Sequence, residues 1–188
     1  MANGCLGALT GSLFGALWFV LGLASVSGDV LSVAQAGGAL LAVLAVLSLG
    51  YLAWSALSTP AHLAGAPASA KKGTDFTFVV IVEAIALGVG NTCLRNTLHR
   101  PELMYTWSAL VVGVHFLPLA KTFATPVLRW IGAAMILVAL ATPIAAQLSD
   151  ASDAVWQAVP GLGCAAVLWG SAIVTAVRQR RLLARAGR

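Results

Sequence analysis

Long apolar stretches alternate with short polar ones along the whole chain. Many of these stretches reach about 20 residues, the length that a helix needs to cross a hydrocarbon core of roughly 30 Å. They lack the alternation of apolar and polar positions that is typical of barrel strands. Because backbone groups in lipid must form their hydrogen bonds internally, helices are the expected structure. We predict membrane-spanning helices at about 7–26, 33–57, 76–98, 104–123, 127–148 and 156–178.

These segments predict an all-α fold, an integral membrane bundle of six transmembrane helices in one domain that covers residues 1–188. The connections are short except for residues 58–75, a Pro/Ala/Gly/Ser stretch that we predict to be a loop. Composition agrees, since 60% of the residues are hydrophobic and only 9% are charged. Soluble globular proteins carry about a quarter charged residues, so a water-soluble surface is excluded.

The basic residues predict how the chain crosses the membrane. Five of the arginines that contribute to the net charge of +5 fall between Arg178 and Arg188, which is typical of an anchor at anionic lipid headgroups rather than of nucleic-acid binding. Basic residues favour the cytoplasmic side. With an even number of spans, we expect a multi-pass cell-membrane protein with both termini in the cytoplasm. Arg95 and Arg100 are the exceptions, because they lie at the predicted outer end of the third helix.

Polar residues concentrate in the third and fourth predicted helices. Glu83 stands in the apolar run VVIVEAIALG, without a basic residue one turn away. A charged carboxylate near the bilayer centre costs roughly 2.5 to 3.5 kcal/mol. Glu83 is therefore expected to face the bundle interior, where it finds a partner or is protonated. The alternative is a neutral glutamic acid that only ties two helices together.

His115 is the residue that helix geometry brings closest to Glu83 in depth. The short HRPEL turn makes the two helices antiparallel neighbours. At about 1.5 Å per residue, His115 lies roughly 16 Å and Glu83 roughly 22 Å below the outer ends of their helices. Asn91, Arg95 and Tyr105 are then expected to line a way up to the outer surface. An ordinary interior histidine is an equally good interpretation of His115 alone.

Aromatic residues complete the predicted site. Most of the six tryptophans lie near span ends, as expected for an aromatic belt, whereas Trp18 and Trp169 lie deeper and are better cavity candidates. We predict catalytic roles for Glu83, His115 and Tyr105. The predicted substrate-binding residues are Asn91, Arg95, Trp18, Trp107, Trp169 and Phe116.

No metal or cofactor site is predicted. The three cysteines are far apart in sequence and form no CxxC pattern. Asp150 and Asp153, in SDASD, invite comparison with aspartate-rich magnesium motifs, but a cap for the last helix explains them more simply. The chain has no Walker loop, HExxH, GxSxG or Rossmann fingerprint.

A carboxylic acid in an apolar pocket can protonate an alkene or epoxide, and aromatic faces can stabilise the resulting carbocation. In its size, its helical hydropathy and its buried acid Glu83, the chain resembles the small bacterial integral-membrane terpene cyclases of indole-terpenoid pathways, such as those for drimentines and xiamycins. The resemblance implies metal-independent, protonation-initiated cyclisation of a farnesyl-type chain on a prenylated indole or cyclodipeptide. The membrane-buried acid would be Glu83.

Two other classes of function remain open from the sequence. Intramembrane Glu and His residues also serve proton relays, which favours a small proton-coupled transporter or channel. A structural subunit would use the polar helix pair as an assembly interface. The expected partners are a lipophilic small molecule and membrane lipid, and a homo-oligomer is an open alternative. A closed apolar chamber around Glu83 would favour the enzyme, and a water-filled path to both surfaces would favour transport.

Overall fold

The computed structural model describes residues 2–26, 70–148 and 154–186, together with the isolated positions 43, 46, 47 and 50. This part of the chain is helical and contains no strand, which confirms the predicted all-α class. Apart from those four isolated helical positions, the predicted span 33–57 lies outside the described residues, as do Asp150 and Asp153. The helices are α1 (Ala2–Leu23), α3 (Ala70–Asn96), α4 (Leu103–Thr122), α5 (Val127–Leu148) and α6 (Ala154–Ala186).

Four of these helices contain stretches that are long and apolar enough to cross a membrane. In α1, the apolar stretch Gly11–Leu23 is shorter. The four spanning stretches are Phe76–Asn96, Leu103–Thr122, Val127–Leu148 and Ala154–Arg178.

Two helices extend beyond the predicted spans. Helix α3 begins at Ala70, so Lys71 and Lys72 lie in its first turns and not in the loop that we expected. Helix α6 continues past Arg178 to Ala186. Hydropathy places the end of an apolar segment, but Lys, Arg, Ala and Leu are strong helix formers that allow a helix to continue beyond it.

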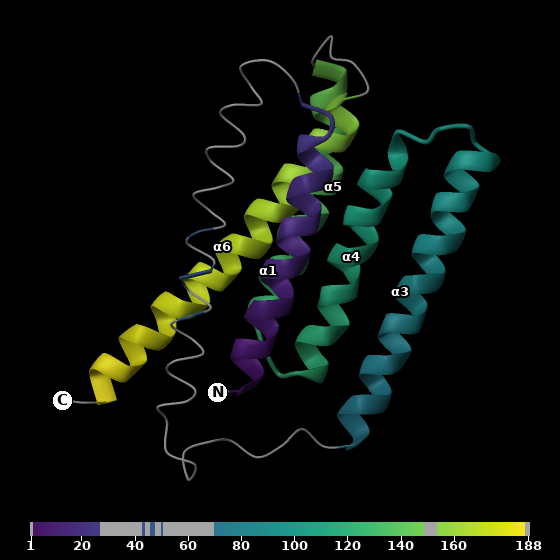
Figure 1. Ribbon diagram of the computed structural model, residues 1–188. Coiled ribbons are helices and arrows are strands. Elements are labelled where there is room, and N and C mark those ends of the chain that lie inside the picture. The colour runs from purple at the N-terminus through teal and green to yellow at the C-terminus, as the bar shows by residue number, and fades with distance from the viewer. Residues whose placement is uncertain are drawn as a thin grey trace.

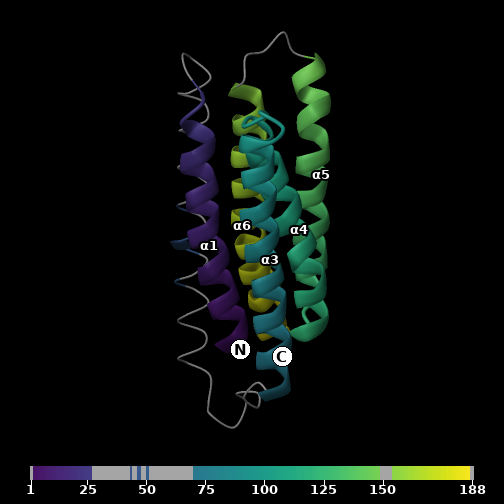
Figure 2. The same cartoon turned by 90° about the vertical axis from the view of Figure 1, so that its right-hand side faces the viewer.

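Helix α6 is central to the described bundle, where it packs against α1, α4 and α5. Helices α4 and α5 also pack against each other. Helix α3 packs on α4 but on no other described helix (Figures 1 and 2). Helix α3 is therefore an outer helix of the described bundle. Figure 1 also shows that α1 begins and α6 ends at the same end of the bundle as the α4–α5 turn.

Small residues let these helices approach closely, which is the main source of helix association where lipid removes the hydrophobic driving force. A Cβ atom on Gly132 of α5 would lie 2.6 Å from the carbonyl oxygen of Gly113 of α4. A Cβ atom on Gly161 of α6 would lie 2.6 Å from the amide nitrogen of Gly22 of α1. Both crossings therefore require glycine. The buried core between them contains Trp18, Ala109, Ile131, Met135, Ala139, Cys164, Ala165, Leu168 and Trp169.

The turn from residue 97 to residue 102 brings α3 and α4 together as an antiparallel pair. His99 adopts a left-handed backbone conformation, with φ of 52°, and the amide of Arg100 donates a hydrogen bond to the carbonyl of Leu94 at 2.8 Å. Pro101 follows, as is common after a helix end because proline lacks the amide that would continue the helix. Arg100 also pairs with Glu102, which accounts for one of the two arginines that the topology rule left unexplained.

Candidate functional site

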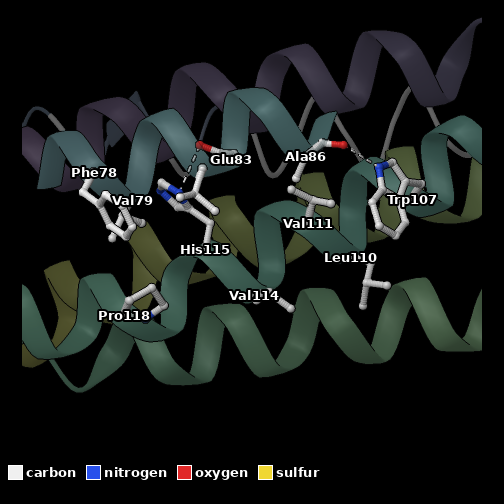
Figure 3. Close-up of a pocket in the computed structure, with 11 residues that line it drawn as sticks. Phe78, Val79, Glu83, Ala86, Trp107, Leu110, Val111, Val114, His115 and Pro118 are labelled. Carbon is white, nitrogen blue, oxygen red and sulfur yellow. Dashed lines mark hydrogen bonds and ion pairs between the residues drawn. The ribbon is translucent and has the colours of Figure 1, made fainter. Parts of the chain in front are cut away.

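A cavity of about 380 Å³ lies along the contact between α3 and α4 (Figure 3). Among the residues that line it, only Glu83 and His115 carry side chains that readily exchange a proton. The remaining lining residues are Phe78, Val79, Val82, Ala86, Trp107, Leu110, Val111, Val114 and Pro118. The site is thus an apolar chamber that is partly open to the surroundings, because Phe78, Val82 and Val114 in its lining are exposed, and it holds one acid and one base.

Glu83 and His115 point toward one another across this cavity (Figure 3). The Nδ1 atom of His115 lies 3.0 Å from Oε2 of Glu83, and the two side chains are 10% and 20% exposed, in that order. The distance is that of a hydrogen bond, although the approach is not aligned well enough for Nδ1 to be a satisfied hydrogen-bonding atom. The backbone of Val79, one turn before Glu83, also lies within hydrogen-bond reach of the imidazole.

The helix lengths explain why the two side chains meet. In the spanning stretch Phe76–Asn96, Glu83 lies about 4.5 Å from the midpoint, and His115 lies about 4 Å from the midpoint of Leu103–Thr122. Both displacements are away from the turn that joins the helices. The antiparallel arrangement therefore brings the acid and the base to the same depth, near the middle of the apolar layer.

Trp107 closes the end of the cavity nearest the α3–α4 turn. Its indole Nε1 donates a hydrogen bond to the backbone carbonyl of Ala86 at 3.1 Å (Figure 3). The ring lies directly against Gly90, where a Cβ atom would overlap Nε1 and Cε2 of the indole. Glycine at position 90 is what allows the indole to lie against the backbone of α3.

Pro118 and Phe78 lie at the opposite end of the cavity (Figure 3). Pro118 stands inside α4 and has no amide hydrogen for the carbonyl of Val114, so one helical hydrogen bond is missing beside the cavity. The hydroxyl of Thr122 donates to the carbonyl of Pro118 at 3.2 Å, which satisfies a carbonyl in the last turn of the helix. The wall around His115 is thus built from an interrupted turn of α4.

Asn91 and Tyr105 do not line this cavity, contrary to the prediction that they share it with Glu83 and His115. Asn91 donates from Nδ2 to the hydroxyl oxygen of Ser108 at 3.4 Å, and its Oδ1 atom is buried without a partner. Eight residues along a helix rotate a side chain by about 80° and advance it by about 12 Å, so Asn91 meets α4 near Trp107 and not beside Glu83. Tyr105 lies partly buried in the first turn of α4.

Arg95 and Phe116 also lie away from the cavity. Arg95 is exposed in the last turn of α3. Phe116 packs against the bundle core, and its ring meets that of His115 edge-on, with centroids 5.7 Å apart. It supports the orientation of the imidazole from behind but offers no surface to a ligand in the cavity.

Trp18 and Trp169 are core residues of the α1–α6 contact and do not line the cavity. They are 6% and 3% exposed. The Nε1 atom of Trp169 donates to the carbonyl of Ser12 at 3.1 Å, and the indole lies 5.2 Å from the ring of Phe19 between centroids. Their burial results from helix packing.

The apolar lining and the glycine behind Trp107 were not identified from the sequence. Val79, Val82 and Val111 do not differ in type from residues that face lipid. The one available signal was the pair of glycines in GVGN, Gly88 and Gly90, on a helix rich in bulky residues. Gly90 contacts Trp107, whereas Gly88 has open space around it.

Metal ligands do not gather in the described part of the chain, where no group of three or more His, Cys, Asp or Glu side chains is placed to hold an ion. No family model, curated protein or solved structure matches this chain. The chemistry of the Glu83–His115 pair and its apolar cavity is therefore the basis on which a function can be argued.

Proposed function

We propose that this chain is an integral membrane terpene cyclase, which protonates an alkene or epoxide of a prenylated substrate and closes a ring through a carbocation. The observation that carries the proposal is the Glu83–His115 pair on the wall of an otherwise apolar cavity at membrane depth. The proposal agrees with the likeness to the small membrane cyclases of indole-terpenoid pathways. It includes six transmembrane helices with both termini in the cytoplasm.

The carboxyl group of Glu83 supplies the initiating proton. One carbon of the alkene takes the proton, the π bond breaks, and the other carbon becomes a cation while Glu83 is left as a carboxylate. The π electrons of a second double bond then form the new carbon–carbon bond. Loss of a proton from carbon to the carboxylate, or to the imidazole of His115, ends the reaction. The product is an isomer of the substrate, so no co-reactant is consumed.

The walls of the cavity suit a cationic intermediate. Apolar side chains exclude water, which would otherwise capture the cation as an alcohol. The ring of Trp107 and the ring of Phe78 border the two ends of the chamber, and an aromatic face attracts a positive charge by about 0.5 to 2 kcal/mol. Stabilisation of this kind acts on the intermediate and not on the neutral substrate, which is what catalysis requires.

The test compares Glu83→Gln with Glu102→Gln. The amide keeps the size of the side chain at position 83 but has no acidic proton to give. Glu102 lies in the α3–α4 turn outside the cavity, which makes it the matched control. Purified proteins in detergent would be incubated with farnesylated indole or a farnesylated cyclodipeptide, and a cyclised isomer of unchanged mass would be sought. In D₂O, the product of alkene protonation should carry deuterium at the carbon that receives the proton.

We expect Glu83→Gln to lower turnover by about ten-thousandfold or more, the upper end for general acid catalysis, and Glu102→Gln to leave it unchanged. Equal turnover in the two variants would overturn the assignment of the acid. If the unmodified protein forms no isomer but carries a proton flux in liposomes that Glu83→Gln removes, the function is proton-coupled transport. The same intramembrane Glu–His pair would then serve as a proton relay.

A further inference from the structure

We infer that Trp107 sets the length of the isoprenoid chain that the cavity accepts. This inference rests on the proposed function, because it assumes that the cavity holds a prenyl chain. According to this inference, Trp107 limits the length of the prenyl group in the cavity, although it does not contact Glu83 or His115.

The acid pair and Trp107 lie at different levels of the cavity. Along α4, His115 is about 4.5 Å from Pro118 at one end and about 12 Å from Trp107 at the other. A double bond held beside Glu83 is therefore near one end of the chamber. Trp107 lies at the far end of the cavity from Pro118 (Figure 3), so the rest of a linear chain would extend toward Trp107.

Trp107 is a fixed wall because two contacts hold its ring. The hydrogen bond from Nε1 to the carbonyl of Ala86 would be lost if the ring swung away. The bare backbone at Gly90 lets the ring lie against α3. The indole thus marks one end of the chamber.

The volume of the chamber limits how much of a chain can lie against its walls. At about 380 Å³ it lies near the lower end of the range of roughly 300–1,000 Å³ that is typical of small-molecule sites. It suits one prenyl chain of farnesyl size. A further five-carbon unit needs space that the indole of Trp107 now occupies, so removal of the indole should admit the longer chain.

The experiment measures binding in detergent of two labelled probes, tritiated farnesol and tritiated geranylgeraniol. The variants are Trp107→Ala, which opens the end of the chamber, and Trp107→Phe, which shortens the ring and removes the N–H donor. Gly90→Ala should push the indole into the chamber. Trp130→Ala is the matched control, because Trp130 is 74% exposed on α5 and does not line the cavity.

We expect the unmodified protein to prefer farnesol, and Trp107→Ala to shift the preference toward geranylgeraniol by about tenfold or more, as a change in hydrophobic pocket size can do. Trp107→Phe should shift the preference in the same direction but to a smaller extent. If the alanine variant does not fold, the phenylalanine variant alone tests the inference. Gly90→Ala should weaken binding of both probes. Trp130→Ala should change nothing.

An unchanged preference in both Trp107 variants would overturn the inference, as would an equal shift in Trp130→Ala or the absence of binding to the unmodified protein. Binding needs no chemistry, so the result is independent of turnover. If the preference shifts but no cyclised isomer forms with any prenyl substrate, the proposed reaction fails and the length limit stands. If the protein cyclises its substrate and the preference does not shift, Trp107 is not the limit and the reaction stands.

Discussion

His115 places its Nδ1 atom 3.0 Å from the carboxylate oxygen Oε2 of Glu83, and the two residues come from antiparallel helices that meet at the same depth of the apolar layer. The edge of Phe116 lies against the imidazole, so the ring is held from two sides. This geometry gives His115 two possible tasks. It can orient the carboxyl group that donates the first proton, or it can take the last proton from the carbocation.

Replacement of His115 separates these tasks. If His115 only orients Glu83, His115→Ala should lower turnover by about a hundredfold or less, at or below the lower end of general acid–base effects, and should leave the set of products unchanged. Cyclisation assays with product analysis by mass spectrometry would measure both. A loss as large as that of Glu83→Gln, or new alkene isomers, would show that the imidazole itself takes a proton from the intermediate.

The α3–α4 turn, which joins the two helices of the site, should lose stability at acidic pH. The hydrogen bond from Arg100, and then one from its own backbone amide, lower the pKa of Glu102 below its ordinary value of 4.5. A lowered pKa in the folded state means that the carboxylate stabilises the fold above a pH of about 4.5. That contribution is lost as the pH falls through the lowered pKa.

Glu102→Gln should therefore lower the melting temperature slightly at pH 7, and the difference from the unmodified protein should shrink as the pH falls below about 4.5. The effect should be small and should shrink in high salt, because Arg100 is exposed and exposed ion pairs are screened. Thermal unfolding followed by circular dichroism at several pH values would measure it. A difference that does not shrink as the pH falls below about 4.5 would show that the carboxyl group acts in some way other than through its charge.

The depth of the acid pair could be predicted from the sequence because depth depends only on residue count and helical rise. Residue count and helical rise place Glu83 and His115 at similar levels. Whether a side chain faces the neighbouring helix, the cavity or lipid could not be predicted in the same way. A bilayer gives no contrast between apolar residues that face lipid and those that face a neighbouring helix, so the sequence does not show which faces of α3 and α4 meet.

Asn91 shows the consequence of that missing contrast. Its polarity suggested a place in the cavity, yet it bonds to Ser108 of α4 outside the cavity. The position of the Trp107 indole depends on Gly90, which lies four residues, or just over one helical turn, after the acceptor Ala86. Contacts that depend on how two helices are rotated about their axes cannot be derived from residue spacing alone.

In the turn between α4 and α5, replacement of one residue by glycine should stabilise the fold. Ala124 adopts φ of 50°, and its amide donates to the carbonyl of Lys121 while the amide of Thr125 donates to that of Ala120. This is the Schellman arrangement, in which glycine normally occupies the left-handed position. Since that conformation costs other residues about 1 kcal/mol or more, Ala124→Gly should stabilise the fold by about that amount. Thermal unfolding in detergent would detect it.

The control for this change is Ala141→Gly, at an exposed position inside α5. In a helix interior glycine is less favourable than alanine by about 1 kcal/mol, so the same replacement should destabilise there. If both variants lose stability, the left-handed conformation at Ala124 is not what limits this turn.

The close contact between α4 and α5 predicts opposite effects for one substitution at two glycines. Gly132→Ala places a methyl group 2.6 Å from the carbonyl oxygen of Gly113, so the helices must separate. Such overpacking costs about 1 to 3 kcal/mol. Gly88→Ala on α3 meets no atom within 4 Å and gains up to about 1 kcal/mol from helix propensity. Thermal unfolding in one detergent would compare the two variants.

The same pair of variants tests whether the bundle positions the site. Helix α4 carries His115 on its α3 side and Gly113 on its α5 side, so a shift of α4 away from α5 moves the imidazole as well. Gly132→Ala should therefore lower turnover as well as stability, although Gly132 does not line the cavity. Gly88→Ala should preserve both. A Gly132→Ala protein as stable as the unmodified one would mean that α4 and α5 do not pack as closely as the Gly113–Gly132 contact requires.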